Sequence, residues 1–154
     1  MRLCYLVCAC LCLSILPASA EMKDRQGWVV IESEQSHADL VSSTRAAIKE
    51  NGLIVVTQAG PTKAAAARGI EIPGNTVIGA FNNDFAVRLL RLSTPAMIEA
   101  PIRFYVTENA DGTATLSYKM PSFVLSPYED EGVDDIAAEL DEVFAAISEQ
   151  AVSR

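Results

Sequence analysis

The first twenty residues most limit what this chain can fold into, because they hold all four of its cysteines. Met1 and Arg2 give a short positive start, and an apolar run follows from 3 to 16. Ala18-Ser19-Ala20 then has the small-x-small pattern that signal peptidase reads. We therefore expect a signal peptide over 1–20 that is cleaved after Ala20, and a protein that is exported to the periplasm or secreted. Lipidation is an alternative, because Val7-Cys8-Ala9-Cys10 loosely resembles a lipidation box, although few apolar residues precede it.

The expected mature chain, 21–154, contains no cysteine. It could form no disulfide, hold no metal through thiolates and use no thiol nucleophile. Its stability would have to come from a single hydrophobic core, for which the chain is long enough. The apolar run at the start is shorter than the roughly 20 residues that span a bilayer. We predict no integral membrane segment in the mature chain.

Charge and histidine content narrow the function classes further. The chain has 20 acidic and 12 basic residues, a net charge of −8, which would repel a phosphate backbone, so we predict no nucleic-acid partner. His37 is the one histidine, and a lone imidazole cannot build a multi-histidine metal site. It falls at an expected helix start, where we predict a solvated side chain. We expect no metal and no cofactor.

The first half of the mature chain alternates strand and helix patterns. Apolar, β-branched runs predict strands over 27–33, 53–57 and 76–81. Helices are expected after Ser36, over 63–68 and after Asn82, each beginning or ending at a capping or turn residue. In the helix after Asn82, we expect a buried face formed by Phe85, Leu89, Leu90 and Leu92.

The second half begins with a β-hairpin. Apolar residues alternate with polar ones over 101–107 and 113–120, around a turn at 109–112. The segment 122–128 is expected to be irregular, with Met97 and Ile98 packing back as a turn before the hairpin. A strong amphipathic helix is predicted from 133 to 147. The whole predicts one α/β (α+β) domain: a single-layer mixed or antiparallel β-sheet packed with helices, in the order β-α-β-α-β-α-β-β-α.

Several of these segments resemble, in order, the family called domain of unknown function 302. The matching segments are the alanine-rich helix with its glycine at 64–69, the strand and Asn turn at 78–83, the Pro-started strand at 100–106, the Ser-Tyr and Pro at 116–121, and Tyr128. The resemblance covers nearly all of 27–150. It implies a compact α/β domain that pairs as a homodimer, and it brings no established activity. Many members carry a His before the alanine-rich helix, where this chain has Gly60-Pro61-Thr62.

We favour a non-catalytic module of the cell envelope that binds a small anionic ligand or a protein partner. Arg103 could hold a carboxylate bidentately, and a helix start at Asn82 and Asn83 could present backbone N–H groups to an anion. Tyrosines would add flat apolar area. The expected ligand-binding residues are Asn82, Asn83, Arg103, Tyr105, Tyr118 and Tyr128.

Two alternatives stay open. One is a hydrolase or isomerase that uses carboxylate acid–base chemistry, with Asp84, Glu99 and Glu108 near strand ends; no catalytic set is assigned. The other is a purely structural homodimer. Its interface would be the outer face of the hairpin, formed by Arg103, Tyr105, Thr107, Thr115, Ser117 and Lys119.

Overall fold

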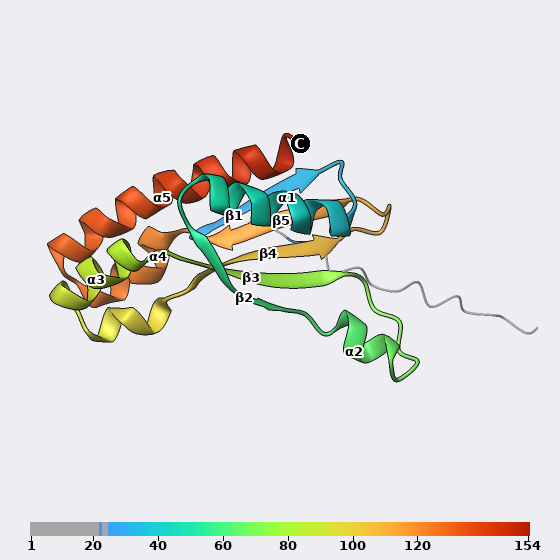
Figure 1. The fold of residues 1–154 in the computed structure, drawn as a ribbon, viewed down its shortest axis with the longest axis horizontal. Coiled ribbons are helices and arrows are strands. Elements are labelled where there is room, and N and C mark those ends of the chain that lie inside the picture. The colour runs from blue at the N-terminus through green and yellow to red at the C-terminus, as the bar shows by residue number, and fades with distance from the viewer. Residues whose placement is uncertain (1–21, 23–24) are drawn as a thin grey trace, which may run out of the picture.

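The computed structural model describes Met22 and residues 25–154. The signal peptide and the cysteines expected within 1–20 lie outside the described residues. The described chain forms one five-stranded sheet with helices packed on it (Figure 1). This is the α+β architecture that the alternating patterns predict.

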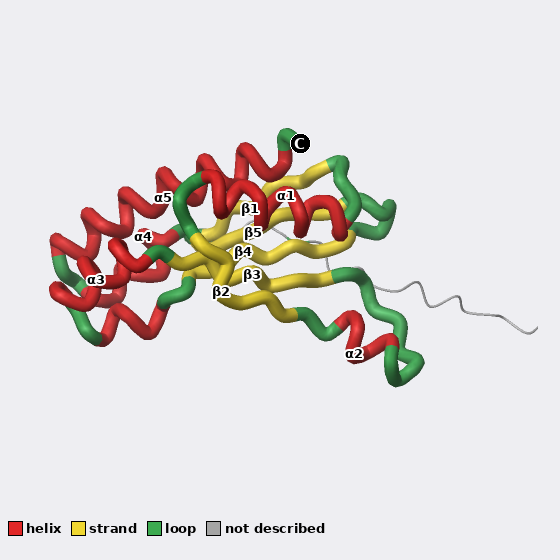
Figure 2. The backbone as a smooth tube through the Cα atoms, in the orientation of Figure 1, coloured by secondary structure: helices red, strands yellow, loops and turns green. Residues whose placement is uncertain are grey.

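Every neighbouring pair in the sheet is antiparallel, in the order β1-β5-β4-β3-β2. This settles the strand sense, which the sequence left open. The first strand therefore pairs with the last one, and the hairpin of β4 and β5 occupies the centre of the sheet (Figure 2). The strands are β1 (Trp28–Ser33), β2 (Ile54–Ala59), β3 (Asn75–Phe81), β4 (Ile102–Glu108) and β5 (Ala114–Lys119).

Helices α1 (His37–Glu50) and α5 (Glu131–Val152) cover one face of this sheet. In Figure 1, α1 lies in front of the strands and α5 runs along the top of the view. The side chain of Ser36 caps α1 by accepting a hydrogen bond from the Asp39 amide at 3.2 Å, as expected. Alternate strand residues such as Ile78 and Leu116 meet the helix residues Leu40 and Ile48, and all four are fully buried.

Three aromatic rings form the centre of that core. Phe104 and Phe144 stack with their ring centroids 4.5 Å apart, and Tyr118 tilts against both, at 5.3 and 5.5 Å. Phe104 and Tyr118 come from the hairpin and Phe144 comes from α5. The cluster therefore joins the central strands directly to the long C-terminal helix.

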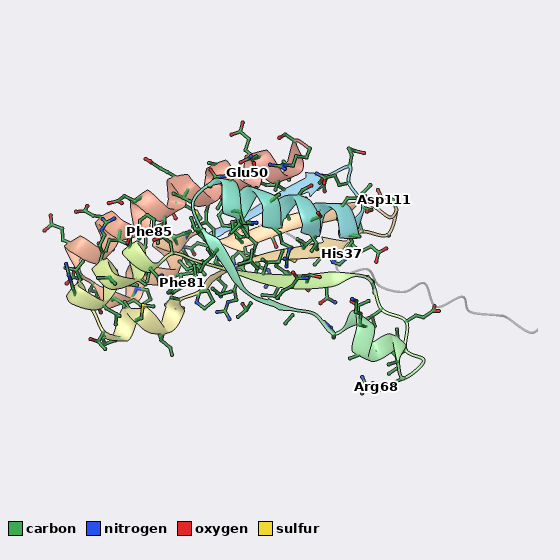
Figure 3. All side chains as sticks on the ribbon, viewed as in Figure 1. His37, Glu50, Arg68, Phe81, Phe85 and Asp111 are labelled. Atoms are coloured by element: carbon green, nitrogen blue, oxygen red, sulfur yellow. The ribbon has the colours of Figure 1, made fainter. Side chains whose placement is uncertain are left out.

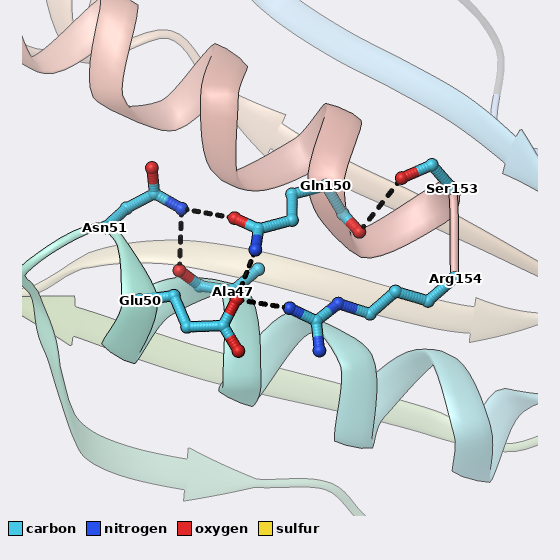
Figure 4. A network of polar contacts seen from close by, with 6 residues as sticks. All are labelled: Ala47, Glu50, Asn51, Gln150, Ser153 and Arg154. Atoms are coloured by element: carbon cyan, nitrogen blue, oxygen red, sulfur yellow. Dashed lines mark hydrogen bonds and ion pairs between the residues drawn. The ribbon is translucent and has the colours of Figure 1, made fainter.

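Polar contacts join the C-terminal ends of α1 and α5 (Figure 4). The Asn51 amide nitrogen donates to the Ala47 carbonyl and to Gln150 Oε1, both at 2.8 Å. The Glu50 carboxylate accepts from Gln150 and forms an ion pair with Arg154 at 2.5 Å. The last residues of the chain are thus part of the packed structure.

A second, smaller core closes one end of the molecule. It is formed by α3 (Asn83–Leu92), the 3₁₀ helix η1 (Pro95–Glu99), α4 (Pro121–Leu125), the 3₁₀ helix η2 (Ser126–Tyr128) and the start of α5. Helices therefore occupy most of 121–128, where the sequence predicted irregular structure. The segment was missed because each helix is too short to show a repeating apolar pattern.

The prediction of which residues form the buried face of α3 was wrong in part. Leu89 is buried, but Leu90 and Leu92 are 44% and 47% exposed, because α3 lies at the end of the molecule and packs along one narrow side. In η1, Met97 packs on the second core as expected, whereas Ile98 is 80% exposed and does not pack back.

Between β2 and β3 the chain makes an excursion that carries α2 (Thr62–Ala66). Figure 1 shows α2 projecting beyond the sheet, and Figure 3 marks Arg68 on the same projection. A bulge between Val55 and Thr57 interrupts the pairing of β2 with β3. Val56, at the bulge, is 45% exposed, so this edge strand contributes little to the core.

Within the described residues, no helix is both long enough and apolar enough to cross a membrane.

Candidate ligand-binding site

A groove of about 470 Å³ lies on the face of the sheet opposite to α1 and α5. Its floor comes from four strands, and its end is formed by residues of η1 and α4. The volume falls within the range of sites for small organic molecules. The lining residues are Trp28, Asn75, Val77, Glu99, Ile102, Arg103, Tyr105, Lys119, Phe123 and Val124.

Strand alternation explains why these side chains share one face. Val77 is paired with Tyr105, and Trp28 is paired with Lys119. The residues next to them along the strands, such as Phe104 and Tyr118, point to the opposite face and form the core. Phe123 adds an apolar wall, since its ring lies directly against the backbone of Gly27.

Positive charge gathers at one end of the groove. Lys119 Nζ lies 5.6 Å from the centroid of the Trp28 ring, and Arg25 Cζ lies 5.8 Å from the same ring. Within residues 25–154 the two ion pairs are Arg88–Glu139 and Arg154–Glu50. In that part of the chain, therefore, Arg103 and Lys119 have no carboxylate partner, although the protein as a whole is acidic.

The carboxylate in the groove lining belongs to Glu99, and it is engaged by a neighbour. The Tyr128 hydroxyl donates a hydrogen bond to Glu99 Oε1 at 2.9 Å. This hydrogen bond raises the pKa of the Tyr128 phenol, with smaller contributions from desolvation and from the Glu99 charge. Tyr128 thus lies next to the rim of the groove and fixes the position of the Glu99 side chain through this hydrogen bond.

Among the expected ligand-binding residues, Arg103 and Tyr105 lie in the groove and Tyr128 contacts its rim. Asn82 and Asn83 lie elsewhere, at the start of α3. Asn82 Oδ1 accepts from the amides of Asp84 and Phe85 at 2.8 and 3.3 Å. Its amide nitrogen donates to the Gly52 carbonyl at 2.9 Å, so this side chain caps the helix.

Tyr118 is not brought together with Arg103 and Tyr105. It is 4% exposed and belongs to the aromatic core on the other face of β5. Burial raises the pKa of its phenol, partly offset by a hydrogen bond with Ser148. In the alternating pattern of β5, Tyr118 falls on the same face as Leu116. That pattern is the sequence signal that places Tyr118 in the core.

The three carboxylates of the acid–base alternative are not assembled in one place. Glu99 shares the groove with Arg103, and Asp84 is exposed at the start of α3. Glu108 accepts a hydrogen bond at 2.5 Å from the amide of Gly74, the residue directly before β3. Each carboxylate thus has a separate environment.

His37 is half-buried, and the prediction of a solvated side chain was wrong. Its Nε2 lies 3.2 Å from the Thr76 hydroxyl, and its ring packs against Gly74, where a Cβ would lie 2.7 Å from the ring. Figure 3 shows His37 at the opposite end of the sheet from Phe81 and Phe85. The described residues contain no group of three or more His, Cys, Asp or Glu side chains that could hold a metal ion.

A second cavity lies beneath α3, close to Phe81 and Phe85. Its lining is almost entirely apolar, and its volume is about 40 Å³. That space is far below the volume of a ligand site. It is better described as a packing defect between α3 and the sheet.

The groove contains residues that the sequence reasoning did not connect with a site, chiefly Trp28, Val77 and Phe123. Lys119 was expected on the hairpin face but not as part of a binding site. Trp28 could be placed next to Lys119 only with the knowledge that β1 pairs with β5. No local pattern carries that information.

Residues 29–151 match the family model of the domain of unknown function DUF302. The chain belongs to the DUF302 family. The resemblance seen in the sequence is thereby confirmed over most of the chain. Among curated proteins, none matches.

A solved structure gives the same fold for a DUF302 protein. The crystal structure of an uncharacterized conserved DUF302 protein from Bacillus stearothermophilus is similar, with a TM-score of 0.74. The two chains are 16% identical, and the similarity covers 82% of this chain and 99% of the other. At this identity the likeness concerns the DUF302 fold alone.

Proposed function

We propose that this DUF302 domain is a non-catalytic ligand-binding module of the cell envelope, and that the groove on the open face of the sheet is its binding site. The groove itself is the observation that carries the proposal. It combines a volume of about 470 Å³ with the aromatic side chains of Trp28 and Tyr105 on its floor. Arg103 and Lys119 line the same groove and form no ion pair within the described residues. The signal-peptide pattern in 1–20 supports export.

The decisive experiment is native mass spectrometry of the protein purified gently from the envelope fraction of its own cells. We expect a mature chain that starts at Glu21 and retains an additional mass. The matched variants are Val77→Tyr, which fills the floor of the groove, and Val87→Tyr, which adds the same group on α3, where Val87 is 47% exposed. The added mass should be lost in the first variant and kept in the second. A bare wild-type chain would contradict the proposal.

A homodimer through the same face is the second candidate. Glu32 lies on this face at the far end of β1 from Trp28, which is beside Lys119. A two-fold axis that lies in the plane of the interface and runs across the strands would bring Glu32 of one copy towards Lys119 of the other. Thr115 and Ser117 are already buried within one chain, at 4% and 0% exposure, and add little contact area.

The same spectra test the dimer. A wild-type dimer without added mass, which becomes a monomer in the Glu32→Lys variant, would favour the structural alternative over the ligand-binding one. A monomer with added mass would favour the reverse. The control is Glu34→Lys, because Glu34 precedes α1 and is also exposed.

A further inference from the structure

The groove combines cationic side chains with apolar and aromatic ones. The cationic heads of Arg103 and Lys119 lie on the strands of the floor, whereas Phe123 and Val124 of α4 provide apolar surface at its edge. Trp28 and Tyr105 lie on the same floor and offer flat rings. A ligand that satisfies all of these groups needs an anionic head and an apolar body.

We infer that the groove selects small aromatic anions, with a carboxylate or sulfonate head held by Arg103 and Lys119 and a flat ring system lying against Trp28 and Tyr105. This rests on the proposed ligand-binding function and adds the ligand class to it. Guanidinium and ammonium groups are the usual partners of such heads.

Charge supports an anion over a cation at this place. The chain carries a net charge of −8, yet Arg25, Arg103 and Lys119 gather at the groove. In the described residues, neither Arg103 nor Lys119 forms an ion pair. Glu99 is the carboxylate in the groove lining, so one negative charge faces the positive charges of Arg103 and Lys119. The local charge therefore remains positive.

Shape supports a ring system over a long acyl chain. The groove is open to solvent along a sheet surface, and it has a volume of about 470 Å³. Acyl chains need an enclosed apolar space, because each CH₂ contributes to binding only when it is buried away from water. Planar rings can stack on Tyr105 and pack against Trp28, whose ring also lies close to Lys119 and Arg25, and can remain accessible at one edge.

Trp28 makes the test direct, because it is the only tryptophan of the chain. Two probes with the same aromatic body are compared: 8-anilino-1-naphthalenesulfonate, which is anionic, and N-phenyl-1-naphthylamine, which is neutral. Binding is measured as energy transfer from Trp28 to the probe. We expect the anionic probe to bind at least about tenfold more tightly than the neutral one, and its affinity to fall as NaCl is added.

The variant Arg103→Gln/Lys119→Gln should lose about tenfold in affinity for the anionic probe and nothing for the neutral one. Its control is Arg45→Gln/Lys49→Gln, which removes the same two charges from a different surface groove, between α1 and β2. Circular dichroism and a denaturant midpoint check that each variant is folded. Decanoate, an anion without a ring, should compete only weakly.

The outcomes separate the two proposals. Both probes could bind equally well, lose binding in Val77→Tyr and keep it in the Arg103→Gln/Lys119→Gln variant. That result would overturn the proposed ligand class but would still support a ligand-binding function. Strong competition by decanoate would overturn the aromatic part. Absence of energy transfer with either probe, or transfer that Val77→Tyr does not reduce, would overturn the binding function itself.

Discussion

Truncation of Phe144 to alanine should be among the most destabilising single changes in this domain. Phe144 is 1% exposed, and its ring lies 4.5 Å from Phe104 and 5.5 Å from Tyr118. Phe→Ala changes in cores cost about 3–5 kcal/mol, and each aromatic pair adds about 0.5–1.5 kcal/mol beyond burial. We therefore expect a loss in the upper part of that range, about 4–5 kcal/mol.

The matched control is Phe123→Ala, because it makes the same chemical change at a side chain that is 41% exposed. We expect a loss of about 1 kcal/mol there. The free energy of unfolding is measured by urea denaturation of the mature domain, with the slope used to check two-state behaviour. Phe144→Leu keeps most of the volume but loses both ring pairs, and should cost about 1–3 kcal/mol.

Phe144→Leu also keeps the test informative if Phe144→Ala does not fold, since a typical domain has only about 5–15 kcal/mol in total. The reasoning would be refuted if the alanine variants of Phe144 and Phe123 lost similar amounts. That result would mean that the aromatic cluster does not hold α5 to the hairpin.

Three further predictions concern caps, backbone and titration. Asn82→Ala should cost about 1–2 kcal/mol in urea denaturation, because two helix amides lose their acceptor; no loss would contradict the capping role. Gly27→Ala should cost about 1–2 kcal/mol, since φ is +74° and a Cβ would lie 2.0 Å from Phe123; an unchanged midpoint would refute the close packing. Glu99→Gln should lower the raised pKa of Tyr128 towards the ordinary value of about 10, as seen by phenolate absorbance. Because the folded protein holds the Tyr128 proton more tightly, the stability due to this shift is full below about pH 10 and is lost as pH rises through the folded-state pKa.

Elements with a repeating pattern were predictable, because burial on one face leaves a period in the sequence. The alternation of Phe104 and Val106 with Arg103 and Tyr105 correctly assigned the two faces of β4. The same reasoning was incomplete for β5, where Thr115 and Ser117 are buried despite facing away from the helices. They are small side chains on an inner strand, and their hydroxyls donate hydrogen bonds to Asn109 Oδ1 and to the Tyr105 carbonyl.

The candidate site could be predicted only in part, because it depends on strand order. Arg103 and Tyr105 lie two residues apart on one strand, so local alternation placed them together. Trp28 joins them through the pairing of β1 with β5, and Phe123 joins them through a helix of five residues. Neither relation leaves a trace in the nearby sequence.

The pairing of Trp28 with Lys119 also has a consequence for how the chain is made. While the protein is being synthesised, β1 is among the first segments to emerge, yet its partner strand is produced last. The sheet cannot close until the hairpin of β4 and β5 is complete, and such long-range pairing is slow to form. A nascent chain ending before Ala114 would leave both β1 and the inner edge of β4 without a partner. We therefore expect the sheet to form only once β5 is available, whether the chain folds during synthesis or after export.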